Sequence, residues 1–358
     1  MTKQRERFFS ILLSIALIFS TVCVYAAATE APDSSATQNS IDSPYTIDTP
    51  YEYPIQPGTP EWDAYETTHE KAVLCQIPED ILGKLTTPAL VETIVNYPFL
   101  VEMTLFATPE EGYAAVHACF NGLPELERRP DGGAVLMDYY EICKKQRSDL
   151  IFLDFMTMEI ILQQPEITVH MSPAQQQRAS TMTQEMSTFF RLQPTPAANV
   201  AYPKTPSGYE VTKSWCTYDK PELTEAEIND INALVLEKYS LSPLRQPTNK
   251  YNCHSYAWYN TSSANKWWID YPNDFINDPY CTRNISAPVA GNRAVYRILA
   301  NGNFVHSAIV QSVSNAGGTS SPNAITVVSK WGKWGLYSHT LFNVPESYGR
   351  NVIFYQIK

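Results

Sequence analysis

The spacing of apolar residues divides the chain into a helical part and a sheet part. In the first half, Leu82, Leu85, Leu90 and Ile94 recur at helical intervals, which predicts helices with one buried stripe. From residue 293 onward, apolar and polar residues alternate instead, which is the period of strands with one buried face. Helices followed by strands predict an α+β fold with an antiparallel sheet.

Capping signals and prolines set the limits of the individual elements. Thr86-Thr-Pro88 is a helix start, because proline is tolerated in a first turn. Thr224 with Glu227 three residues later forms a capping box, which predicts a helix to about Tyr239. Further helices are predicted over 132–145, 150–163 and 172–190, and five strands over 293–299, 305–313, 324–329, 335–341 and 351–357.

Changes in composition divide the chain into five segments. The first has a basic start, an apolar run and Ala26-Ala-Ala28, which is typical of a cleaved export signal. The second is rich in Ser, Thr, Pro and Asp without any period, which predicts disorder. The five segments are a signal peptide over 1–28, a disordered tether over 29–60, a helical domain over 61–190, a proline-rich linker over 191–212 and a second domain over 213–358.

Charge and export narrow the range of partners. The net charge is −11 and the pI is about 5.1, and no basic cluster offsets it, so nucleic acid is not an expected partner. The signal predicts a secreted, extracellular or cell-envelope protein with no stable membrane insertion after cleavage. Six cysteines follow the signal, an even number that permits disulfides in an exported protein.

One cysteine stands where a polar loop turns into an aromatic segment. Asn252 is a good N-cap residue, so Cys253 is expected in the first turn of a helix. There the helix dipole and the free N–H groups favour the thiolate, which is the reactive form. The competing interpretation is a buried and inert thiol, which is the commoner state of free cysteines.

A histidine on a strand supplies the candidate base. His306 lies at the start of the strand 305–313, where it is expected to face the helix of Cys253 and form a nucleophile–base pair with it. Ser329, on the next strand, is the candidate third residue that orients His306. His339, one strand further, is the rival for that role. His254 directly follows Cys253 and is a weaker base candidate.

These motifs resemble the papain-like cysteine peptidases and amidases of the NlpC/P60 and CHAP superfamily. The resemblance covers residues 249–358 and rests on YNCHSYAW at 251–258, VHSAIV at 305–310 and ITVVSKWG at 325–332. The order of cysteine, histidine and polar residue is that of the family. Two departures are Ser329, where the family usually has His, Asn, Gln or Glu, and a long aromatic insertion between the cysteine and the histidine.

The resemblance implies a papain-like second domain that needs no cofactor and cleaves amide bonds of cell-wall (peptidoglycan) peptides. Cys253 would attack the carbonyl after passing its proton to His306, and we expect a thiolate–imidazolium pair with a thiol pKa well below that of a free thiol. Trp331 is the expected substrate contact, with Trp334 and the pair Trp267–Trp268 as further candidate walls of the cleft. For at least two of these four tryptophans, packing in the core or on a sheet face is the favoured interpretation.

Two other interpretations remain open at this stage. The first is a catalytically inactive binding or adhesion module on the same fold, which the unusual third residue would favour. The second is a zinc site built from Cys253, His254 and His306. It ranks last, because the sequence offers no second cysteine or acidic residue at ligand spacing.

Overall fold

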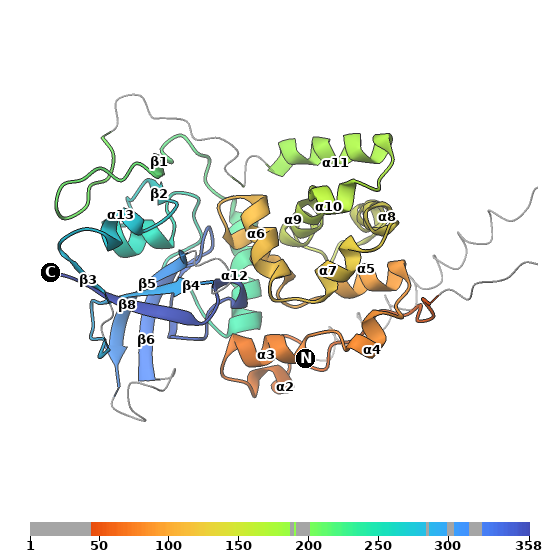
Figure 1. The fold of residues 1–358 in the computed structure, drawn as a ribbon, viewed down its shortest axis with the longest axis horizontal. Coiled ribbons are helices and arrows are strands. Elements are labelled where there is room, and N and C mark those ends of the chain that lie inside the picture. The colour runs from red at the N-terminus through yellow and green to blue at the C-terminus, as the bar shows by residue number, and fades with distance from the viewer. Residues whose placement is uncertain (1–43, 187–189, 191–200, 284–285, 299–303, 315–323) are drawn as a thin grey trace, which may run out of the picture.

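A computed structural model describes residues 44–186, 190, 201–283, 286–298, 304–314 and 324–358, and it has an α+β fold with antiparallel sheets. Helices occupy one side of the molecule and the main sheet the other, with α12 (Glu225–Tyr239) between them (Figure 1). The predicted signal peptide lies outside the described residues, as does the tether before residue 44.

Short helices joined by tight turns form the first part of the chain. Several begin with a threonine cap: the Thr67 side chain accepts from the Glu70 N–H, and Thr108 accepts from the Glu111 N–H. The elements are α2 (Pro60–Asp63), α3 (Thr68–Leu74), α4 (Glu79–Leu82), α5 (Thr87–Val95), η1 (Leu100–Leu105), α6 (Pro109–His117), α7 (Gly122–Glu127), α8 (Gly132–Gln146), α9 (Phe152–Ile161), α10 (Pro165–Thr168) and α11 (Pro173–Met186).

The second part is built around a six-stranded antiparallel sheet in the order β3-β8-β4-β5-β6-β7. A separate pair of strands, β1 and β2, precedes it along the chain. The elements are β1 (Ser214–Cys216), α12, η2 (Ser255–Tyr259), β2 (Trp267–Ile269), α13 (Asn273–Ile276), β3 (Cys281–Arg283), β4 (Arg293–Arg297), β5 (Phe304–Val313), β6 (Ile325–Lys330), β7 (Leu336–Thr340), η4 (Glu346–Tyr348) and β8 (Asn351–Ile357).

The five predicted strands are confirmed and coincide with β4 to β8 to within about two residues. The capping box is confirmed as well, since Thr224 and Glu227 exchange both bonds at the start of α12. The short strands β1, β2 and β3 were not predicted. Each has three residues, too few for the period of two to be visible in the sequence.

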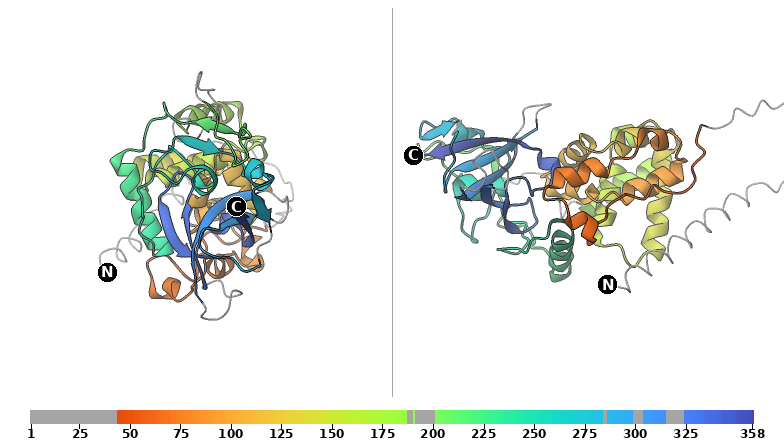
Figure 2. Two further views of the ribbon diagram at one scale, coloured as in Figure 1. Left: turned by 90° about the vertical axis from the view of Figure 1, so that its left-hand side faces the viewer. Right: turned by 90° about the horizontal axis from the view of Figure 1, so that it is seen from below.

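The two faces of the six-stranded sheet pack against different parts of the chain. One face carries Tyr296, Ala308 and Val327 and shares a single hydrophobic cluster with the helices. The other face carries Val295 and Tyr355 and is covered by the segment of η2 and by α13. In Figure 2 the sheet and the helices meet end to end along a broad junction. The predicted helical and sheet domains therefore share one core.

Two segments predicted to be unstructured are packed in their described parts. Residues 44–60 lie against the helices, with Tyr53 buried and its hydroxyl donating to the Thr93 carbonyl at 2.9 Å. Residues 201–212 lie against the sheet region, where Val211 is buried in the second cluster. Single apolar residues within polar sequence anchor both segments. An average composition, which is the basis for predicting disorder, does not reveal such single anchors.

The carboxylate of Glu102 ties the helices to the sheet region. It lies in η1 and is fully buried, with the Tyr239 hydroxyl donating to it at 2.7 Å. The backbone N–H groups of Glu346 and Ser347 donate to it at 3.0 and 2.8 Å. These three donors come from α12 and η4, so one side chain joins three elements that are distant in sequence. Burial raises the pKa of Glu102 to about 7, although the hydrogen bonds oppose the shift.

Glycine permits a second close contact at the same junction. Gly332, in the turn between β6 and β7, has φ of +47°, and a Cβ there would lie 2.0 Å from the Leu105 carbonyl oxygen. A side chain at this position would therefore separate the turn from η1. Lys333 reinforces the contact, since its ammonium donates to the Phe106 carbonyl at 3.2 Å.

Titration of Glu102 should make the junction more stable in acid. A carboxyl whose pKa rises from 4.5 to about 7 on folding contributes stability below pH 4.5 that is lost as the pH rises through 7. The free energy of unfolding of wild type, relative to Glu102→Gln, should therefore fall by roughly 2 kcal/mol between pH 5 and pH 8. Urea denaturation of both proteins measures it. A difference that does not change with pH would mean that Glu102 titrates normally.

Replacement of Gly332 by alanine should destabilise the protein more than replacement of Gly291. Both residues have positive φ, which costs alanine about 1–2 kcal/mol, but nothing lies within 4 Å of a Cβ at Gly291. The backbone overlap at Gly332 should add roughly 1–3 kcal/mol. Urea denaturation of the two variants measures the loss in free energy of unfolding. Equal losses would show that the turn at Gly332 is not in close contact with η1.

None of the six described cysteines forms a disulfide bond. No helix within the described ranges has the length and apolar character needed to cross a bilayer.

Candidate active site

Asn252 fixes the start of the helix that carries Cys253. Its Oδ1 accepts from the N–H groups of Ser255 at 3.0 Å and Ile269 at 3.2 Å, and its Nδ2 donates to the Ile269 carbonyl at 2.7 Å. The amide thus caps the helix, as the sequence predicts, and also joins it to β2. Cys253 and His254 form the first helical residues, and the chain then widens into the π-helix η2. Such wide turns are frequent at functional sites.

Cys253 lies at a cavity between the helices and the sheet region. The cavity has a volume of about 230 Å³ and is lined on one side by Leu105, Phe106 and residues of α6, and on the other by Cys253, Trp268 and Tyr348. Phe304 and Val305, at the start of β5, also line it. Cys253 is only 5% exposed, whereas Tyr271 at the cavity is 39% exposed. The cavity therefore has an exposed edge at Tyr271 and a buried side at Cys253.

The environment of the sulfur keeps it as a thiol. Burial raises the pKa of Cys253 to about 11, while the backbone N–H groups of Ser307, His254 and Cys253 itself act in the opposite direction, as does the charge of Lys330. The expected low thiol pKa is therefore not what this structure supports. The helix start supplies the stabilising N–H groups, but the loss of water around a buried sulfur outweighs them.

Alkylation of Cys253 should be slow at neutral pH and rise steeply with pH. A thiol with a pKa of about 11 is almost entirely protonated at pH 7, so its rate constant with iodoacetamide should rise about tenfold per pH unit from 7 to 9.5. Peptide mass mapping assigns the rate to Cys253, and Cys253→Ser is the blank. A rate that is already level at pH 8 would show a preformed thiolate.

His306 lies next to the strand amide that interacts with the sulfur. Its ring is on the opposite face of β5 from Ser307 and stacks on Tyr348, with centroids 4.1 Å apart and planes at 6°. Among the described residues no hydrogen bond joins it to Cys253, and neither ring nitrogen has a partner although the residue is fully buried. Burial, with the nearby His339 and His254, holds the pKa of His306 well below its usual value. The imidazole is therefore neutral.

The expected third residue bonds to a different histidine. The Ser329 hydroxyl lies 2.8 Å from Nε2 of His339, and Nδ1 of His339 lies 2.8 Å from the Thr340 carbonyl. Ser329 shares a sheet face with His306, as expected from its parity, but it does not orient that ring. Burial lowers the pKa of His339 to about 4. Neither residue lines the cavity of Cys253.

The tryptophans expected in the cleft lie mainly in the core. Trp331 is fully buried, donates to the Ser329 hydroxyl at 2.9 Å and packs edge-on against Tyr239. Trp334 is also fully buried. Of the four, Trp268 lines the cavity. The reason is that residues 331–334 turn inward toward η1 at Gly332, so their rings fill the junction instead of a cleft.

A buried lysine near the site was not singled out by sequence. The Lys330 ammonium donates to the Gly332 carbonyl at 2.7 Å and to the Thr248 carbonyl at 3.3 Å. It thus joins the turn after β6 to the loop before Cys253. Burial lowers the pKa of Lys330 to about 7, and the charge of Cys253 acts in the opposite direction. The apolar strand before Lys330 is the only sequence signal that it would be buried.

His254 acts as a support for the helix. Its Nδ1 lies 2.8 Å from the Ser307 hydroxyl, which also accepts from the Trp258 indole at 3.0 Å. Burial lowers the pKa of His254 to about 3, so the ring is neutral. In the described part of the chain, no group of three or more His, Cys, Asp or Glu side chains is placed to hold a metal ion, so the zinc interpretation gains no support.

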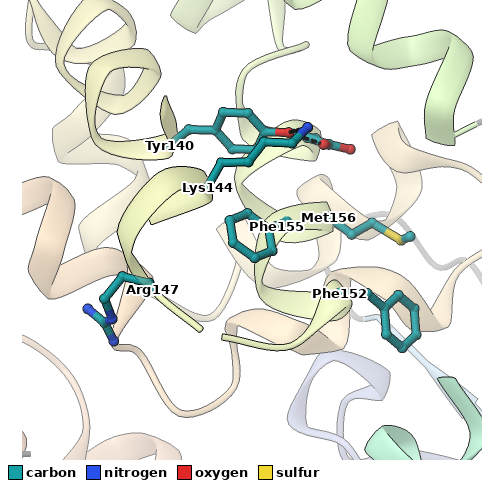
Figure 3. Close-up of a pocket in the computed structure, with 7 residues that line it drawn as sticks. Tyr140, Lys144, Arg147, Phe152, Phe155 and Met156 are labelled. Atoms are coloured by element: carbon teal, nitrogen blue, oxygen red, sulfur yellow. Dashed lines mark hydrogen bonds between the residues drawn. The ribbon is translucent and has the colours of Figure 1, made fainter. Parts of the chain in front are cut away.

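A second hollow lies between α8 and α9. Its volume is about 310 Å³, and Figure 3 shows Lys144 and Tyr140 on α8 facing Phe155 and Met156 on α9. The Tyr140 hydroxyl donates to Glu159 at 2.6 Å and accepts from Lys144 at 3.1 Å. No cysteine or serine lines it. The cavity that contains Cys253 is therefore the better candidate for covalent chemistry.

No family model, no curated protein and no solved structure matches this chain.

Proposed function

We propose that this chain is an exported cysteine amidase or peptidase that hydrolyses amide bonds of cell-wall (peptidoglycan) peptides, with Cys253 as nucleophile and His306 as base. The observation that carries the proposal is the site of Cys253: a buried helix-start cysteine that lines a cavity whose wall also includes the exposed Tyr271. The resemblance of residues 249–358 to the NlpC/P60 and CHAP superfamily supports the papain-like fold, the substrate class and export.

The unpaired ring of His306 supports its role as the base. A buried polar group without a partner costs about 1–3 kcal/mol, so each one calls for an explanation, such as a catalytic role or a bound water or ion. Both ring nitrogens of His306 are buried polar atoms of this kind. Its neutral imidazole can accept a proton, which a ring that is already charged cannot do.

In the proposed reaction the resting pair is a neutral thiol and a neutral imidazole. As the sulfur attacks the substrate carbonyl, His306 takes the thiol proton, and the backbone N–H groups at the start of the helix donate to the oxyanion. His306 then passes the proton to the leaving amine, so the amide bond breaks and a thioester on Cys253 remains. Water hydrolyses the thioester and releases the acid. The His306 ring would have to reorient toward the sulfur, because it lies on the opposite face of β5 from Ser307, does not line the cavity and makes no hydrogen bond to Cys253 among the described residues.

A catalytically inactive binding module is the second candidate. The raised pKa of Cys253 and the absence of a bond to His306 in the described chain favour it. In that case the cavity would bind a cell-wall fragment without cleaving it, and replacement of the thiol by a hydroxyl would leave binding unchanged.

His306→Phe separates a catalytic role from a structural one. Phenylalanine keeps a ring to stack on Tyr348 and removes two nitrogens that have no partner, so the free energy of unfolding should be unchanged or higher. The rate of amide hydrolysis should fall about 100- to 10,000-fold. Release of amino groups from peptidoglycan digests measures activity, and urea denaturation measures stability.

Cys253→Ser should lower the same activity by a factor of about a thousand or more. Cys281→Ser is the matched control, because Cys281 is a half-buried cysteine on β3 outside the cavity, and it should keep wild-type activity. An active His306→Phe protein would remove His306 from the mechanism. Equal activity of wild type and Cys253→Ser would leave the binding module as the function.

A further inference from the structure

One face of the main sheet lies beneath the start of the helix that carries Cys253. Val328 of β6 packs there against Tyr251 and Tyr256, which flank Cys253 in the sequence. Lys330 follows Val328 by two residues on the same strand, so its side chain leaves the strand on the same face. The fully buried Lys330 therefore lies on the side of the sheet that supports Cys253.

The residues that the sequence suggested as base and third residue point to the other face of the sheet. Ser307 of β5 shares the face of Lys330, because its hydroxyl lies 2.8 Å from Nδ1 of His254 on the helix. His306 and Ser329 are the strand neighbours of Ser307 and Lys330, so their side chains point the opposite way. Among the described residues of β5 and β6, Lys330 is therefore the charged side chain beneath the helix start.

Three backbone carbonyls surround the nitrogen of Lys330. Its Nζ donates to the carbonyls of Gly332 at 2.7 Å, of Thr248 at 3.3 Å and of Trp334. An ammonium has three N–H donors, one for each carbonyl, whereas a neutral amine has two and would turn its lone pair toward an oxygen. The carbonyls thus favour the charged form, although burial lowers the pKa of Lys330 to about 7. Below that pH the group is mainly an ammonium.

Within the described chain, the groups that contact this ammonium are uncharged. They are the three carbonyl oxygens and the ring of Tyr251, whose centroid lies 5.4 Å away. The Glu222 carboxylate accepts from the Thr248 hydroxyl at 2.9 Å, so its charge acts on the ammonium from beyond that residue. Lys333, in the same turn, repels the ammonium when both are charged. The Cys253 thiolate, when it forms, is a further negative charge that acts on the ammonium.

We infer that Lys330 is a positioning residue of this site and that its ammonium is the fixed countercharge of the Cys253 thiolate. The role in catalysis rests on the proposed function, in which the sulfur becomes negative while His306 takes its proton. A positive charge that is already in place stabilises the thiolate without any movement of its own, and opposite charges attract strongly in a poorly hydrated interior. Lys330 takes no part in the proton transfer, and it does not line the cavity that would hold the substrate.

A neutral thiol reagent measures the countercharge without a known substrate. The Cys253 thiolate attacks methyl methanethiosulfonate, forms a disulfide with its methylthio group and releases methanesulfinate. At pH 6, Lys330→Met keeps the apolar stem but removes the charge, so the rate constant at Cys253 should fall about 3- to 30-fold. Lys330→Gln keeps N–H donors for the carbonyls and should lower the rate constant to a similar extent. Peptide mass mapping assigns the rates to Cys253.

Lys250→Met is the matched control. The Lys250 ammonium is also buried and held by backbone carbonyls, those of Thr217 and Tyr218. Tyr218 is 73% exposed, so this charge lies in a loop at the surface, where water and salt screen it. The control should therefore leave the rate constant at Cys253 within about twofold of wild type. Wild-type rates in both Lys330 variants, or an equal loss in Lys250→Met, would overturn the inference.

A permanent charge at position 253 separates the electrostatic role from a structural one. Cys253→Asp places a carboxylate where the thiolate forms, and Cys253→Asn is its neutral isostere. At pH 6, the ratio of the unfolding equilibrium constants of Cys253→Asp and Cys253→Asn should rise about 3- to 30-fold when Lys330→Met is added. Urea denaturation of the four proteins measures this ratio. An unchanged ratio would mean that Lys330 only holds the loop before Cys253, and it would overturn the inference.

Both measurements are independent of catalysis. If amide hydrolysis is absent or survives Cys253→Ser, the proposed function fails, while the reagent rates and the stabilities still report the countercharge. If hydrolysis depends on Cys253 but the Lys330 variants react like wild type, the inference about Lys330 alone is wrong.

Discussion

The buried carboxylate of Glu102 is the constraint on which the site depends. It accepts hydrogen bonds from Tyr239 of α12 and from the N–H groups of Glu346 and Ser347, so it fixes the helices, α12 and the segment before β8 relative to one another. Leu105 and Tyr348, which line the cavity of Cys253, follow Glu102 and Ser347 closely in sequence. The anchor that joins the two regions therefore also sets the distance between the walls of the cavity.

Burial has a consistent effect on the chemistry of this site. It raises the pKa of the Cys253 thiol and lowers the pKa values of His306, His254 and Lys330, so the groups around the sulfur tend toward their neutral forms. A resting thiolate–imidazolium pair would place two opposite charges in this poorly hydrated space. A proton transfer that occurs only as the sulfur attacks avoids that cost. The proposed mechanism follows from this physical limit.

The sequence predicted the elements better than their packing. The strands β4 to β8 follow from a period of two in the sequence, and the capping box of α12 follows from a local exchange of hydrogen bonds. Both signals lie in residues that are close together in the sequence. The cap at Asn252 was predictable for the same reason. The burial of residues 44–60 was not, because it depends on single anchors such as Tyr53 that contact residues about forty positions away.

For the candidate site, too, local features were predicted and long-range packing was not. Cys253 was predicted at a helix start and lies there, but strand parity alone could not tell which face of β5 carries His306 relative to that helix. The bond between Ser329 and His339 joins side chains on one face of the neighbouring strands β6 and β7. The inward turn of Trp331 accompanies the contact between Gly332 and Leu105, which joins residues more than two hundred positions apart. The contribution of α6 to the cavity has no sequence signal for the same reason.

The most direct test of the account is whether Cys253 becomes acylated. Wild-type protein and Cys253→Ser would be mixed with p-nitrophenyl acetate, and the intact mass and the modified peptide would be determined within seconds. The account predicts a burst of about one equivalent of p-nitrophenol and one acetyl group on Cys253 in wild type, with neither in the variant. Acetylation that is spread over surface lysines and is equal in both proteins would contradict it.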